Sequence, residues 1–170
     1  QQVGEMLERS AVVLQLPGQV VPPFSNLEEA VMADLVRKVD YYSTEVPDRP
    51  GEAASILATL AIEGVDLLAF TGFPSGRKSQ LDFVPDDAAT FKRAAAAMKL
   101  KVSTKKSGFL VQGADRKGAV AAVLTRLAIA KVNVTAVDAV SAGAKRFAAI
   151  LWVKPADVRK AAKALGAQAR

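Results

Sequence analysis

Two stretches of this chain decide its fold. They read DRPGEAASILATLAIEGVDLLAF over residues 48–70 and DRKGAVAAVLTRLAIAKVNVTAV over residues 115–137. A constant offset of 67 (115 − 48) superposes the two stretches and continues through both flanks without a gap. Self-similarity at one fixed spacing indicates two copies of the same structural unit.

Hydrophobic periodicity predicts the same elements in each copy. Apolar residues at helical spacing are followed by a β-branched strand, a glycine turn at Gly76 or Gly143, a return strand and a second helix. Pro155 suits the start of the last helix and Gly166 its end. The expected strands are 36–46, 65–73, 79–84 and 100–104 in the first copy and 109–113, 132–140 and 146–153 in the second; the expected helices are 53–61, 91–98, 120–128 and 158–165.

The order strand, helix, strand, strand, helix, strand is that of a ferredoxin-like βαββαβ unit. We therefore predict the α+β class, with two tandem ferredoxin-like units and helices on one face of an antiparallel sheet. Only five residues follow the last helix, so the second unit lacks its fourth strand. We expect one continuous seven-stranded sheet in the order 2-3-1-4-1′-3′-2′, with 100–104 at its centre, joined to 109–113 by a turn at 105–108. Pairing of 109–113 with 11–16 is the competing solution.

The predicted organisation is an N-terminal extension over 1–34, a first domain over 35–106 and a second over 107–170. The second and third strands of each copy are apolar on both faces, whereas a sheet covered on one side has polar residues on the other. A second subunit, forming a homodimer, or the apolar stretch 11–24 is expected to cover the open face.

Composition narrows the possible functions. The 170 residues contain no Cys and no His, which excludes disulfides, thiolate or imidazole metal sites and Ser-His-Asp or Cys-His catalysis. We expect no cofactor and no metal. No apolar run is long enough to span a membrane, so we predict a soluble, cytoplasmic protein. The net charge of +6 permits an anionic partner without requiring one.

The segment 48–70 resembles the ACT domain, a small amino-acid-sensing module attached to many enzymes of amino-acid metabolism, and 115–137 is similar to it too. The resemblance rests on a D-R-P-G-like loop, a helix with paired leucines and a G-V-N-I-like start of the second strand. It implies a stand-alone regulatory or sensor protein, without catalytic activity, that binds an amino acid and acts on a partner enzyme. Lys117 replaces the proline at Pro50, and Asp66 stands where the family often has Asn, so we expect at most one copy to be occupied.

The predicted ligand site can be argued from chemistry alone. A loop before a helix presents free backbone N–H groups that bind a carboxylate, and a glycine lets the ligand approach closely. The ammonium group of an amino acid then needs an acidic or amide acceptor. The alternative is that Asp48 and Asp115 only cap their helices. The candidate residues are Asp48, Arg49, Pro50, Gly51, Glu52 and Asp66 in the first copy and Asp115, Arg116, Gly118, Ala119 and Asn133 in the second.

Two other functions compete with the sensor. One is a purely structural or oligomerising ferredoxin-like protein. The other is single-stranded RNA binding, which this topology supports when aromatic side chains on the central strands are exposed. The aromatic residues available for that are Tyr41, Tyr42, Phe83, Phe109 and Trp152, without a K/R-G-F-like motif. We therefore do not favour nucleic acid as a partner.

Overall fold

The structure is a computed structural model that describes residues 15–16, 19–20 and 34–168. The chain divides into two compact parts, 1–33 and 34–170, and each is described by itself. In the first part, β1 (Gln15–Leu16) and β2 (Gln19–Val20) pair as an antiparallel ladder. The rest of the apolar stretch 11–24, proposed above as a cover for the sheet, lies outside the described residues.

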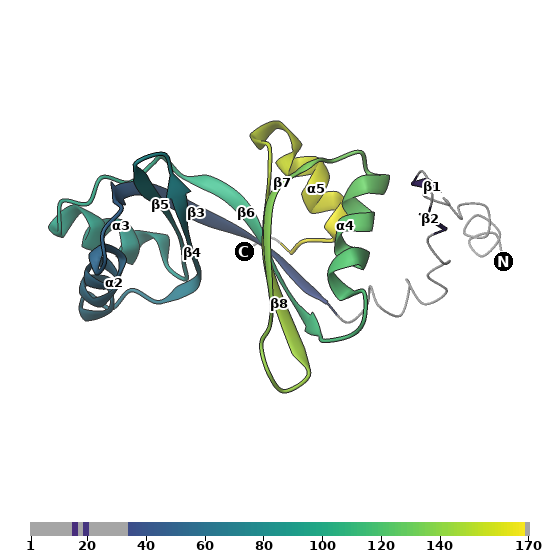
Figure 1. Cartoon of the computed structure of the whole chain (residues 1–170), viewed down its shortest axis with the longest axis horizontal. Coiled ribbons are helices and arrows are strands. Elements are labelled where there is room, and N and C mark those ends of the chain that lie inside the picture. The colour runs from purple at the N-terminus through teal and green to yellow at the C-terminus, as the bar shows by residue number, and fades with distance from the viewer. Residues whose placement is uncertain (1–14, 17–18, 21–33, 169–170) are drawn as a thin grey trace. The chain divides into compact units, whose positions relative to one another are not determined.

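The second part contains the two copies, and nearly all of the predicted elements are present (Figure 1). The last helix is preceded by a 3₁₀ turn that has Pro155 at its start, and it ends at Gly166 in the left-handed conformation, as predicted. The elements are β3 (Leu35–Pro47), α2 (Glu52–Ile62), β4 (Leu67–Ser75), β5 (Lys78–Pro85), α3 (Ala88–Ala97), β6 (Lys106–Ala114), α4 (Ala119–Ile129), β7 (Val134–Ser141), β8 (Arg146–Val153), η1 (Pro155–Asp157) and α5 (Val158–Leu165).

The strands form one antiparallel sheet in the order β4-β5-β3-β6-β8-β7. This confirms the α+β class with two ferredoxin-like units, the second without a fourth strand of its own. The strand β3 is 13 residues long and serves both copies. Its first half, from Leu35 to Tyr41, pairs with β6, and its second half, from Tyr42 to Pro47, pairs with β5. The first half of β3 therefore fills the fourth-strand position of the second copy.

The predicted seven-stranded order is wrong. Residues 100–104 are not a ladder strand, and Val102 has no partner between Phe109 and Gln112. The predicted turn at 105–108 is wrong because residues 106–108 already belong to β6, where Lys106 pairs with Tyr41. Segment 100–104 instead runs beside the second half of β3, and the chain continues into β6 without reversing. Phe109–Gly113 has β8 on one side, and β3 pairs with its residues 109–112 on the other. Most of the competing partner, 11–16, lies outside the described residues.

The gap-free superposition also fails at one place. Phe70 pairs with Phe83 and the equivalent Val137 pairs with Leu151, so the offset rises from 67 (137 − 70) to 68 (151 − 83) across the hairpin. The turn of the second copy is therefore one residue longer. Residues of β8 therefore correspond to residues of β5 at an offset of 68, and all other equivalent residues of the two copies are 67 apart.

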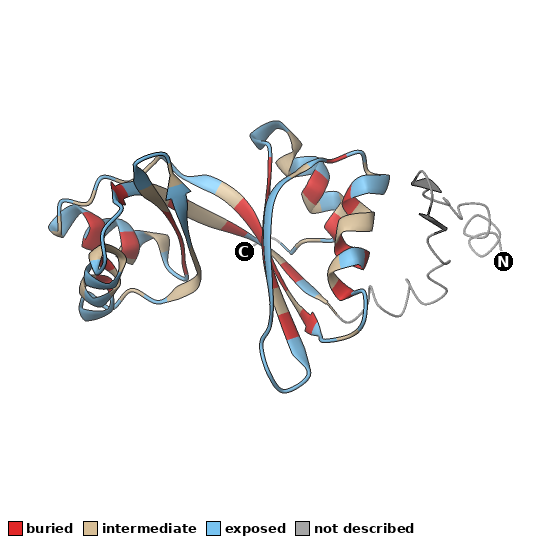
Figure 2. Ribbon diagram, viewed as in Figure 1, coloured by how far each residue is buried: buried red, intermediate tan, exposed pale blue. Residues whose placement is uncertain are grey.

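Residues alternate along β3 between two faces of the sheet. Val36 packs with α4 and α5, and Tyr42 with α2 and α3, so the helices cover one common face. On the opposite face, Val39 lies in a third apolar cluster that takes residues from both copies. Figure 1 shows the helix pairs at the two ends with the strands between them, and Figure 2 shows buried residues along the sides of the helices that face the sheet. On the face without helices, the part of the sheet from the first copy thus packs partly against the part from the second copy. The third cluster contains Val39, Val84, Leu110, Ile150 and Trp152, with Tyr41, Leu68 and Ala69 packed against it.

Candidate functional site

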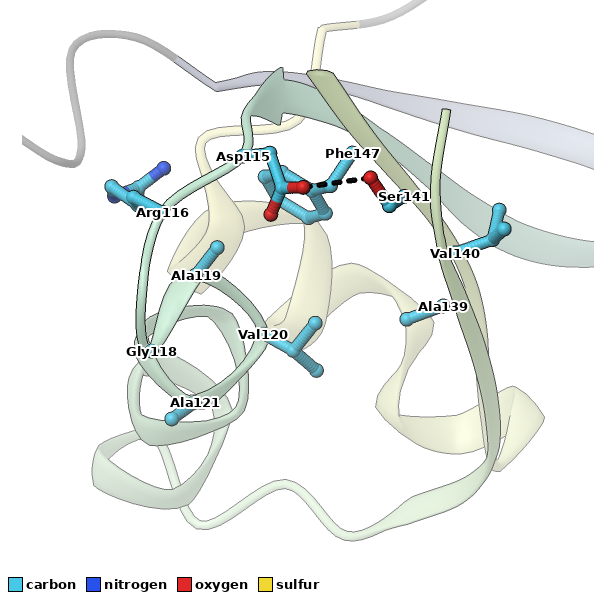
Figure 3. A pocket seen from close by; sticks show the side chains of 10 residues that line it. All are labelled: Asp115, Arg116, Gly118, Ala119, Val120, Ala121, Ala139, Val140, Ser141 and Phe147. Carbon is cyan, nitrogen blue, oxygen red and sulfur yellow. Dashed lines mark hydrogen bonds between the residues drawn. The ribbon is translucent and has the colours of Figure 1, made fainter. Parts of the chain in front are cut away.

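Equivalent cavities lie beside the two predicted loops, and each has a volume of about 250 Å³. Each is bounded by the loop, the first turn of the following helix, the edge strand and the return strand. The first cavity is lined by Val46, Pro47, Asp48, Arg49, Glu52, Ala53, Gly72, Phe73, Pro74, Ser79 and Leu81. The second, drawn in Figure 3, is lined by Asp115, Arg116, Gly118, Ala119, Val120, Ala121, Ala139, Val140, Ser141 and Phe147.

Both helices begin at a glycine in the left-handed conformation, Gly51 with φ 90° and Gly118 with φ 78°. Residues with a Cβ atom adopt this conformation at a cost, which explains the glycine in each copy. Neither helix has a side-chain cap. The N–H groups of the first turn have no carbonyl four residues earlier in the helix, so the helix start favours an anion.

The two aspartates do not cap the helices. Asp48 Oδ1 accepts a hydrogen bond from the Ser79 hydroxyl at 3.0 Å, and Asp115 Oδ2 accepts one from the Ser141 hydroxyl at 2.7 Å. Each carboxylate therefore ties its loop to a neighbouring strand. Ser79 lies on the return strand β5, whereas Ser141 lies at the end of the edge strand β7.

The arginines that follow these aspartates differ in their surroundings. Arg116 forms two parallel hydrogen bonds with the Asp34 carboxylate, Nη1 to Oδ1 at 3.1 Å and Nη2 to Oδ2 at 3.0 Å. The Asp34 side chain is only 3% exposed. Arg49 is exposed, and among the described residues its guanidinium has no hydrogen bond or ion pair.

The structure brings most of the predicted site residues together at the loops. Pro50 lies in the first loop but does not line the cavity, and Gly51 likewise contributes backbone conformation rather than a wall. Asp66 and Asn133 lie beyond the other ends of α2 and α4, just before β4 and β7, and line neither cavity. Within one copy, the helix separates these two side chains from the loop.

Sequence reasoning missed three polar residues at the loops: Asp34, Ser79 and Ser141. Ser79 and Ser141 do not correspond to each other in the repeat, so the superposition of the copies gives no signal for them. Gly113 offers a signal for Asp34, because the equivalent position of the first copy is the larger residue Val46. A Cβ atom on Gly113 would overlap the Asp34 carboxylate and lie 2.7 Å from the Phe147 ring.

A separate polar group lies on the helix-free face. Burial raises the pKa of Asp82, although the hydrogen bond from Gln80 (2.9 Å) and the charge of Lys106 act in the opposite direction. Burial and the Asp82 charge raise the pKa of Tyr41. A third cavity of about 270 Å³ lies between β4 and the strands β7 and β8, and it is mostly apolar.

The described residues contain no group of three or more Asp or Glu side chains placed to hold a metal ion. Within the same residues, no helix has the length and apolar character needed to cross a membrane. Of the five aromatic residues considered for RNA stacking, Tyr41 is half-buried, and Tyr42, Phe83, Phe109 and Trp152 are at most 6% exposed.

No protein-family model matches the sequence, and no curated protein is similar enough to be matched. Solved structures are similar in fold. A protein from Bacteroides thetaiotaomicron has a TM-score of 0.65 and 17% identity, covering 78% of this chain and 88% of its own. The ligand-free regulatory subunit of aspartate kinase from Thermus thermophilus has a TM-score of 0.55 and 17% identity, covering 81% and 97%. The corresponding subunit from Thermus flavus has a TM-score of 0.51 and 17% identity, covering 79% and 95%.

The chain has the fold of these solved structures, with two ferredoxin-like units in tandem. At this level of identity the likeness establishes the fold, in agreement with the resemblance of the two loop-and-helix stretches. Its two copies share one sheet, and each has a loop cavity at the start of its first helix.

Proposed function

We propose that this protein is a non-catalytic regulatory protein that binds an amino acid in a loop cavity of an ACT copy. The observation that carries the proposal is the recurrence of a cavity of about 250 Å³ beside the uncapped first helix of each copy. This volume is slightly below the roughly 300–1,000 Å³ typical of drug-sized ligands, so it suits a small molecule.

The chemistry of the cavity supports a ligand with two opposite charges. Free N–H groups at a helix start bind a carboxylate, while Asp48 or Asp115 is placed to accept hydrogen bonds from an ammonium group. Asp66 and Asn133 lie too far along the chain of each copy to join these contacts from within it. They contribute only if a second chain brings them to the loop, as a homodimer would.

The proposal includes a partner enzyme and a cytoplasmic location. It draws on the aspartate kinase subunits, which are regulatory proteins of similar fold and size. A chain of this kind changes the activity of a catalytic partner because ligand binding favours one of two arrangements of the complex.

A thermal-shift screen against the twenty amino acids, followed by calorimetry, tests ligand binding. A ligand at one hundred times its dissociation constant stabilises the folded state by about 2.7 kcal/mol. A folded sample that shows neither a shift nor heat with any amino acid would refute the proposal. The exposed edge strand β7, with Val137 and Val140 exposed, then favours the second candidate, a purely oligomerising protein. Light scattering would test that function directly.

A further inference from the structure

We infer that only the cavity of the first copy binds the ligand, with Arg49 holding its carboxylate and Glu52 joining Asp48 in holding its ammonium group. The equivalent cavity of the second copy binds no ligand, and its side chains instead hold the loop to neighbouring parts of the chain. This inference rests on the proposed function and assigns it to one of two sites. Three differences between the cavities carry it.

The first difference is the state of the arginine. The Asp34 carboxylate neutralises Arg116 through two hydrogen bonds, and Arg116 Nη1 also donates to the Ala114 carbonyl at 3.1 Å. In Figure 3 the Arg116 side chain lies on the outer side of its loop, away from Val120 and Ala139, which line the cavity interior. A ligand carboxylate would have to compete with a buried carboxylate that is already in place. Arg49 meets no such competitor among the described residues.

The second difference is a bridge between the loop and the edge strand. In the second copy, the hydrogen bond from Ser141 to Asp115 joins the loop to β7 (Figure 3). The residue equivalent to Ser141 in the first copy is Pro74, which has no side-chain donor. Asp48 bonds instead to Ser79 on β5, so no such bond joins the loop to β4. A ligand enters the first cavity without breaking a hydrogen bond at this position.

The third difference is the residue that opens each helix. Glu52 lines the first cavity, and no hydrogen bond or ion pair engages its carboxylate within the described part of the chain. Its equivalent is Ala119, which is buried and carries no charge. The first cavity therefore offers one unpaired cation and one unpaired anion, which matches the two charges of an amino acid. The second cavity offers neither.

Calorimetry of the full chain with the amino acid that gives the largest thermal shift in the panel of twenty tests the inference. We expect one site per chain. Arg49→Gln should weaken binding about tenfold or more, because a charge-assisted hydrogen bond to the carboxylate is lost. The exposed Arg159→Gln, on α5, controls for the loss of one surface charge and should leave the affinity unchanged.

Variants of the second cavity complete the test. Arg116→Gln should keep the stoichiometry and the affinity within about twofold, and Arg116→Lys replaces it if the first variant does not fold. Combining Asp34→Asn with Ser141→Ala releases both restraints and should add a weak second site. Two sites per wild-type chain, or loss of binding in the Arg116 variants with retention in Arg49→Gln, would overturn the inference while the proposed function stands. If no amino acid binds the wild type, both fail.

Discussion

The two copies complete their sheets in different ways. In the first copy, the fourth-strand position beside β3 holds 101–103, which forms three hydrogen bonds to that strand. The Ser103 N–H donates to the Ser43 carbonyl at 2.8 Å, the Ser43 N–H to Ser103 Oγ at 3.0 Å, and the Thr44 hydroxyl to the Lys101 carbonyl at 2.6 Å. In the second copy, the same position holds half of a regular strand, with an unbroken register from Leu35 to Tyr41.

This difference shows that similar sequences do not make independent domains. The second copy takes its fourth strand from a segment that comes before the first copy in the chain. The end of the chain also docks on that segment, where the Gln168 N–H donates to the Val36 carbonyl at 2.9 Å. Residues 34–41 are therefore part of the second copy in space and of the first in sequence. Changes there should destabilise the second copy most.

We expect the largest effect from Gly113→Ala. The equivalent residue of the first copy is Val46 on β3, so the first strand of the repeated unit accepts a side chain at this point. In the second copy, the new Cβ atom would meet the Asp34 carboxylate and the Phe147 ring. Overpacking of this kind lowers the free energy of unfolding by about 1–3 kcal/mol. Because the new side chain also displaces the buried ion pair, we expect a loss of about 3 kcal/mol or more.

Urea unfolding measures that loss, and a double-mutant cycle assigns it. In an Asp34→Ala background, Gly113→Ala should cost clearly less, because one of the two overlapping groups is gone. Equal costs in both backgrounds would show that Asp34 does not require the glycine. A loss below about 0.5 kcal/mol in the wild-type background would mean that the strand simply shifts away.

The sequence predicted the repeat, the helices and the class of the sheet, because each depends on local periodicity and on turn residues such as Gly166. It did not predict that β3 serves two copies, because the pairing of 35–41 with 106–112 depends on contacts between distant segments. The extra residue in the second hairpin also could not be predicted, because it leaves the hydrophobic pattern of the two strands nearly unchanged. The glycines predicted both loops. The buried position of Asp34 was not predicted, because a single acidic residue before a strand is usually a surface residue.

The second prediction compares two ion pairs. Asp34→Ala should lower the free energy of unfolding by about 2 kcal/mol, because it removes the carboxylate that neutralises Arg116, whose side chain is only 28% exposed. Glu45→Ala removes the pair with Lys78, whose N–O distance is a similar 3.1 Å but whose side chains are 58% and 51% exposed. Its loss should be below about 0.5 kcal/mol. Urea unfolding of both variants measures the contrast, and equal losses would show that burial of Asp34 adds nothing.

The third prediction concerns the irregular fourth position of the first copy. Ser103→Ala removes the acceptor of the Ser43 N–H, and Thr44→Val removes the donor to the Lys101 carbonyl. Each should cost about 1 kcal/mol, the usual net value of one hydrogen bond. Amide hydrogen exchange should show loss of protection around Ser43 and Ser103 with little change in β8. Equal loss of protection in both copies would contradict a local role for this segment.

The smallest effect should come from Asp82, whose equivalent on β8 is the apolar Ile150 in the third apolar cluster. Because burial raises the pKa of Asp82, the folded state binds a proton more readily than the unfolded state. Its contribution to stability is therefore greatest below the unfolded pKa and is lost as the pH rises through the higher folded pKa. Asp82→Asn removes the cost of the buried charge and should stabilise the protein slightly at neutral pH. Urea unfolding between about pH 4 and about pH 8 measures this effect, with the exposed Asp138→Asn on β7 correcting for the change in net charge. A variant that is less stable than the wild type at neutral pH would show that Gln80 and Lys106 more than compensate for burial, and that the charged Asp82 is a favourable member of the helix-free face.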